Sequence, residues 1–135
     1  MIPVTLSLRF RTRLDGESDE SAMQVQGALE REVGGYALRY TERIDDANTE
    51  VLIRTDGVRA TIERTGAASA TFTLEPGVPH TCEYVTDAGT IDMTVKDASV
   101  RSQLTESGGT LHLAYTLELG GGESKHEIAI VVRKG

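Results

Sequence analysis

Apolar and polar residues alternate at the start of the chain. Every even position from Ile2 to Phe10 is apolar, whereas Arg9, Arg11 and Arg13 occupy odd positions. A period of two residues places successive side chains on opposite faces of a β-strand. The pattern therefore predicts one long strand over 2–14, with one buried face and one basic face in water.

Similar alternation recurs along the rest of the chain, and turn-forming residues separate the segments. Glycine, proline, aspartate and asparagine permit the backbone conformations that tight turns need. We therefore expect further strands over 36–44, 51–53, 58–63, 68–74, 80–86, 91–95, 111–119 and 126–133. We expect loops over 15–20 and 45–48, a two-residue hairpin turn at Asp56-Gly57, and an irregular connection over 98–109.

Residues 22–33 fit two patterns. Val25 and Leu29 would share one face of a helix, but they would also share one face of a strand. A strand is favoured because both neighbouring segments need pairing partners. The helix remains the alternative.

The composition agrees with a β-protein. Threonine, valine and isoleucine together account for 34 of the 135 residues, and only three prolines interrupt the chain. Branching at Cβ suits a pleated sheet better than a helix. The sequence predicts a single all-β domain over 1–135, either a sandwich or an antiparallel meandering barrel of eight to ten strands. The barrel is favoured because closure removes exposed sheet edges.

Several short motifs occur in an order that resembles the YwiB-like proteins, a family of small bacterial proteins of unknown function. These motifs are Tyr40-Thr41-Glu42, Asp56-Gly57 through Arg64-Thr65-Gly66, Phe72, Pro76-Gly77, Tyr84 to Val95, Leu113-Ala114-Tyr115 and His126-Glu127. The resemblance covers roughly residues 2–133 of the chain. It implies a calycin-like, or lipocalin-like, β-barrel. It brings no established catalytic residues.

The charge of the chain narrows the classes of partner. With 14 basic and 21 acidic residues the net charge is −7, which argues against nucleic acid and against an anionic membrane. The one cysteine, Cys82, fits a reducing compartment. No apolar stretch is long enough to span a bilayer, and the first residues lack a signal-peptide pattern. We therefore expect a cytoplasmic protein. The arginines at 9, 11 and 13 are expected to pair with acids of neighbouring strands.

Two charged residues fall on apolar strand faces. Glu42 follows Tyr40 on the even face of 36–44, and Arg64 ends the even face of 58–64. If these faces line a barrel, both side chains point inward near its mouth, where they could bind the polar head of an amphiphile. The alternative is a purely structural ion pair. Tyr40 and His126, which share the parity of apolar neighbours, are the other candidate ligand contacts.

Catalytic and metal sites have weaker support. His80 and Cys82 would share a strand face, but the recurrent ligand spacings of zinc sites are absent. Side chains two apart on a strand are about 7 Å apart at Cα and poorly aimed at each other for a nucleophile–base pair. His112 is expected on the outer face. We predict neither an enzyme nor a metal or cofactor site.

Two functions remain. The first is a barrel that binds a small hydrophobic or amphiphilic molecule, for which Ala60, Ala68 and Ala70 would leave room. The second is a filled barrel that serves as an interaction or structural protein, such as a homodimer. Ala129 and Val131 give the last strand apolar residues on both faces, which predicts that a partner or the segment 98–109 covers it.

Overall fold

The computed structural model describes residues 1–44 and 46–135, and ten antiparallel strands account for most of them. Their bounds are β1 Ile2–Leu14, β2 Glu17–Glu32, β3 Gly35–Ile44, β4 Ala47–Thr55, β5 Ala60–Thr65, β6 Ala70–Leu74, β7 His80–Thr86, β8 Gly89–Thr105, β9 Gly108–Leu119 and β10 Gly122–Lys134. The all-β prediction is confirmed, and residues 22–32 belong to a strand rather than a helix. No helix in the described part of the chain is long and apolar enough to cross a membrane.

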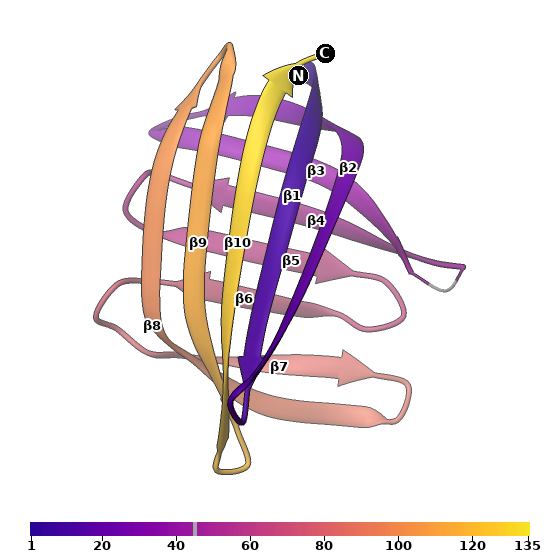
Figure 1. The fold of residues 1–135 in the computed structure, drawn as a ribbon, viewed down its shortest axis with the longest axis vertical. Coiled ribbons are helices and arrows are strands. Elements are labelled where there is room, and N and C mark those ends of the chain that lie inside the picture. The colour runs from indigo at the N-terminus through magenta and orange to yellow at the C-terminus, as the bar shows by residue number, and fades with distance from the viewer. Residues whose placement is uncertain (45) are drawn as a thin grey trace.

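The strands form one meandering sheet that curls into a nearly closed barrel, as predicted. The order is β6-β5-β4-β3-β2-β1-β10-β9-β8-β7, so both chain termini lie in the middle of the sheet on neighbouring strands (Figure 1). At the seam between β6 and β7, Ser69 and Val85 exchange two backbone hydrogen bonds of 2.9 Å. This isolated bridge joins the two ends of the sheet, so that the barrel is nearly closed there.

Two groups of strands cross each other in the barrel. The strands β8, β9, β10, β1 and β2 run steeply in Figure 1, and β3 to β7 run across them. The long strands β2 and β8 connect the groups, because each pairs with one group along part of its length and with the other group beyond it. Strand β8 turns at a register shift between Lys96 and Ser99, where a bulge bends the strand.

The core fills the space between the two groups. The inward residues are the alternating apolar positions of the sequence, and the largest of them are almost inaccessible to solvent. They include Val4, Leu6, Leu8, Leu29, Leu38, Ile53, Ile62, Leu74, Leu111, Leu113 and Ile130.

Three loop predictions were wrong because polar side chains do not prevent strand pairing. Only Asp15 and Gly16, both with positive φ, separate β1 from β2, so residues 17–20 are strand. A two-residue turn of this kind matches the twist of a hairpin. Residues 47–48 begin β4, and Asp45 lies outside the described residues. The segment 98–109 contains the second half of β8, the hairpin turn and the start of β9.

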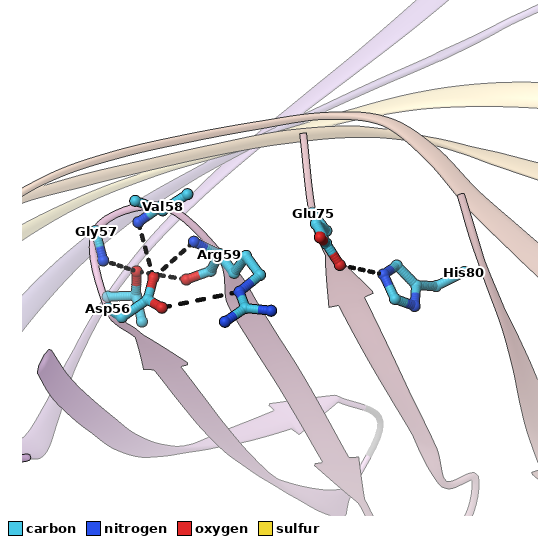
Figure 2. A network of polar contacts seen from close by, with 7 residues as sticks. Asp56, Gly57, Val58, Arg59, Glu75 and His80 are labelled. Carbon is cyan, nitrogen blue, oxygen red and sulfur yellow. Dashed lines mark hydrogen bonds and ion pairs between the residues drawn. The ribbon is translucent and has the colours of Figure 1, made fainter. Parts of the chain in front are cut away.

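The turn at Asp56 is longer than predicted. Its loop has four residues, because Thr55 pairs with Ala60. The Asp56 carboxylate accepts backbone N–H bonds from Val58 and Arg59, both 2.8 Å long (Figure 2). These bonds lower the pKa of Asp56. They also satisfy the backbone N–H groups of Val58 and Arg59, which lie in the loop only because it is longer than two residues.

The segment 98–109 does not cover the outer face of β10, and coverage by a partner stays a prediction. The part of this segment in β8 lies two strands away from β10 in the sheet, and Gly108 and Gly109 of β9 pair with the edge of β10 rather than fold over its face. Val131 is accordingly 45% exposed.

Candidate functional site

Glu42 and Arg64 meet inside the barrel, as their parity predicted. Arg64 reaches across Val51 of β4, which pairs with it directly, and its guanidinium contacts both oxygens of the Glu42 carboxylate. The Nη2–Oε2 distance is 2.5 Å and the Nη1–Oε1 distance is 3.4 Å. The Glu42 side chain is 6% exposed and that of Arg64 is 28% exposed. The carboxylate is therefore buried, while the cation keeps contact with solvent.

Tyr40 completes this group of polar side chains on β3. Its hydroxyl donates to Glu42 Oε1 over 3.4 Å. Burial, reinforced by the negative charge of Glu42, raises the pKa of Tyr40 well above its usual value. Burial opposes ionisation of Arg64, but the hydrogen bond and charge of Glu42 hold its pKa above the usual value. Tyr40 is thus neutral and Arg64 is charged at neutral pH.

His126 lies in an aromatic stack that borders this group. Its ring stacks on Tyr115 with centroids 5.2 Å apart, and Tyr115 stacks on Phe72 with centroids 6.0 Å apart. Burial raises the pKa of Tyr115 to about 12, and the charges of Arg64 and Glu42 act on the same hydroxyl. The hydrogen bonds of His126 within the described residues go to Ser124, 2.8 Å away, and to Thr12, 3.5 Å away. His126 is therefore linked to the ion pair through Tyr115 rather than by a direct bond.

Acid should destabilise the fold through His126. Burial lowers the pKa of His126 below its ordinary 6.5, so in the range between the two values the unfolded chain binds a proton that the native protein does not. Native stability then falls as the pH drops below 6.5, with a limiting slope of about 1.4 kcal/mol per pH unit for one proton. Chemical unfolding between about pH 7.5 and 5 should show a smaller loss in His126→Gln than in the unaltered protein. Equal losses of stability with falling pH in the two proteins would contradict the role given to His126.

A hollow opens beside the ion pair. Strand β2 pairs with β3 only from Gly27, opposite Tyr40, to Glu32, and the two strands diverge beyond that point. The space has a volume of about 370 Å³. Its lining consists of Phe10, Ser21, Ala22, Met23, Glu42, Arg43 and Arg64.

The hollow combines an apolar wall with a charged end. Phe10 and Met23 are partly buried against the core, and they provide the apolar wall. A guanidinium carries five N–H donors, and Glu42 engages two nitrogens of Arg64. Donors therefore remain at Arg64 for a further acceptor. Phe10 and Met23 were missed as site residues, because only the divergence of β2 from β3 exposes them.

Near the axis of the barrel, the described apolar side chains pack against one another in one core. Leu6, Leu38, Ile53 and Leu113 are at most 1% exposed. The alanines at 60 and 70 are buried in the core and do not line the hollow beside Glu42. Free space at the ion pair is thus confined to the mouth.

The remaining candidates lie apart from this hollow. His80 Nε2 is 2.9 Å from Glu75 Oε1, across the loop between β6 and β7 (Figure 2). Cys82 is buried, and burial raises the pKa of its thiol. His112 lies on the outer face of β9, as predicted, near Glu127. Within residues 1–44 and 46–135, no group of three or more His, Cys, Asp or Glu side chains could hold a metal ion.

Comparisons with known proteins identify a family. The sequence model described as "Domain of unknown function (DUF1934)" matches residues 6–130. The crystal structure of the YwiB protein from Bacillus subtilis is similar, with a TM-score of 0.89 and 20% sequence identity, over 99% of this chain and 92% of the other. At that identity the likeness shows a shared fold. No curated protein matches the sequence.

Proposed function

The chain belongs to the DUF1934 family, whose name assigns no function, and from the hollow at its mouth we propose that it binds a small amphiphilic molecule. The polar head lies against Arg64, and the apolar part lies against Phe10 and Met23. The observation that carries the proposal is the divergence of β2 from β3, which leaves a cavity beside a partly exposed guanidinium.

The dimensions and chemistry of the hollow limit the ligand. Its volume of about 370 Å³ is at the small end for ligand sites, which span roughly 300–1,000 Å³. The filled axis prevents a long chain from passing through the barrel. Arg64 offers only donors, so the head must be an acceptor, and an anionic carboxylate would bind it best. A short-chain amphiphile with an anionic head fits these limits.

Binding without catalysis is the simpler role for these residues. Glu42 is held by Arg64 and Tyr40, which leaves it poorly placed to transfer a proton. The raised pKa of Cys82 disfavours the thiolate that a nucleophile needs. A single buried thiol also suits the reducing cytoplasm, which we propose as the location.

Decanoate is a suitable probe of the hollow. Isothermal titration should show saturable binding of decanoate and none of decyltrimethylammonium, which has a cationic head. The variant Arg64→Gln should weaken decanoate binding by roughly tenfold or more, the expected loss of a charge-assisted hydrogen bond. The matched variant Arg39→Gln, at an exposed position on β3, should bind as the unaltered protein does.

A second variant guards against a loss of binding through unfolding. Ser21 is exposed and lines the hollow, so Ser21→Phe should fill the space without touching the ion pair. It should retain the melting temperature and lose decanoate binding. Equal binding by decanoate and the cationic amphiphile, or full binding by Ser21→Phe, would overturn the proposal.

Native mass spectrometry addresses the alternative role. A small mass that copurifies with the protein and is absent from Ser21→Phe supports the ligand-binding barrel. A dimer without a ligand, together with no decanoate binding, favours an interaction or structural protein.

A further inference from the structure

The arginines of β1 are only partly neutralised on the outer face of the barrel. Arg11 lies opposite both Glu20 and Glu127, and its Nη2 is 2.8 Å from Glu20 Oε1. Arg9, in contrast, lies between Ala22 and Ala129. The expected pairing with neighbouring acids therefore holds for Arg11 and fails for Arg9.

Further along β1, cations face each other. Arg13 pairs with Lys125 of β10 on one side and with Ser18 of β2 on the other. Like charges directly opposite each other in a sheet destabilise it. Within the described chain, neither Arg13 nor Lys125 forms an ion pair. The fold therefore tolerates a repulsion here that a Ser or Thr at either position would remove.

The positive surface continues onto two more strands. His112 of β9 lies beside Ala129, and Arg101 of β8 lies opposite His112. We call the set Arg9, Arg11, Arg13, Arg101, His112 and Lys125 the basic face. Its five permanent cations and the two carboxylates directly opposite them, Glu20 and Glu127, give a local charge of +3, on a chain whose net charge is −7. Glu123, beside Lys125 on the same face of β10, is paired with Lys96.

The surface between these cations is accessible. A hollow of about 400 Å³ lies among Arg9, Arg11 and His112, and small residues such as Ala22 and Ala129 form part of its lining. The Nδ1 atom of His112 is buried there without a hydrogen-bond partner in the described structure. An incoming acceptor can thus reach the guanidinium groups of Arg9 and Arg11, whereas the buried Nδ1 atom stays out of its reach.

We propose that the basic face binds an acidic segment of a partner protein. Guanidinium groups bind carboxylates through paired, charge-assisted hydrogen bonds. Alternate residues on a strand are about 7 Å apart, so the arginines of β1 match carboxylates at alternate positions of an extended peptide. Nucleic acid fits less well, because the aromatic residues on β1 and β9, Phe10 and Tyr115, point inward and leave no surface for base stacking.

The test uses a fluorescein-labelled peptide of twelve residues with alternating glutamate and serine. Fluorescence anisotropy at about 0.05 M salt should show saturable binding, which weakens as salt is raised because the contacts are exposed charges. The double variant Arg9→Gln/Arg13→Gln should bind at least roughly tenfold more weakly. The double variant Arg39→Gln/Arg59→Gln has the same net charge and alters exposed arginines of β3 and the 56–59 loop, so it should bind normally.

Two further measurements make the outcome decisive. The Arg9→Gln/Arg13→Gln variant should keep or raise the melting temperature, because it removes the Arg13–Lys125 repulsion, and it should leave decanoate binding unchanged. A uridine dodecanucleotide should bind more weakly than the peptide. Absence of peptide binding, equal losses in the two double variants, or tighter binding of the nucleotide would overturn the proposal without affecting the hollow at the barrel mouth.

Discussion

Arg64→Met is expected to cost about 3 kcal/mol of folding stability, the lower end of the range for breaking a buried ion pair. The Glu42 side chain is 6% exposed in the native protein, and without Arg64 the interactions that it keeps include the long hydrogen bond from Tyr40. Burying a charge without its partner is costly. Urea unfolding at neutral pH measures the loss.

Removing Glu42 should cost less folding stability than removing Arg64. Glu42→Gln leaves Arg64 able to turn toward solvent, because its side chain is 28% exposed, and should cost only about 1 kcal/mol. The double variant Glu42→Met/Arg64→Met buries no charge and should lie within about 1 kcal/mol of the unaltered protein. Additive losses in this cycle, or a larger loss for Glu42→Gln than for Arg64→Met, would show that the pair does not act as a buried unit.

Local periodicity predicted the fold well because strand alternation is set by the backbone itself. Positions 36–44 and 58–64 alternate, and this parity alone placed Glu42 and Arg64 inside the barrel. Their mutual contact followed from both faces lining one interior. The polar hairpin at 15–20 was missed because strand pairing there depends on backbone hydrogen bonds and a two-residue turn rather than on apolar residues.

The hollow could not be predicted in the same way. Its existence depends on where β2 stops pairing with β3, and that register involves residues distant in sequence. Met23 and Phe10 look like ordinary core positions until that divergence is known. The Tyr115–His126 stack likewise arises from the pairing of β9 with β10. The predicted strand 2–14 is longer than the predicted strands after Gly35. This difference in length was the signal in the sequence that pairing between some strands must stop before the longer strand ends.

The charge pairing on the outer face of the barrel could not be predicted from the sequence either. The sequence showed three arginines in alternation and many acids, which suggested pairing. Whether a given arginine faces an acid depends on single-residue register, and the observed register places Arg9 between alanines. The alternation over 2–14 therefore predicted the basic face correctly, but the ion pair expected for Arg9 was wrong.

Gly109→Ala should destabilise the protein by at least about 3 kcal/mol, because it combines backbone strain with a steric clash. Gly109 adopts φ of +131°, and a Cβ at this position would overlap the carbonyl oxygen of Gln103 on β8. Neither the glycine nor the paired strand can move without disturbing β8, β9 and β10 together, since Gly109 pairs with Leu104 on one side and with Val132 on the other.

Gly121 supplies the matched control for this effect. It also has a positive φ, +85°, but a Cβ there would meet no atom within 4 Å. Gly121→Ala should therefore cost only about 1 kcal/mol, the strain of a left-handed alanine. Thermal and urea unfolding of both variants separate the two contributions. Similar losses for the two variants would mean that β8 can move away from β9 at low cost, and the close approach of Gly109 to Gln103 would then not be required for the closed barrel.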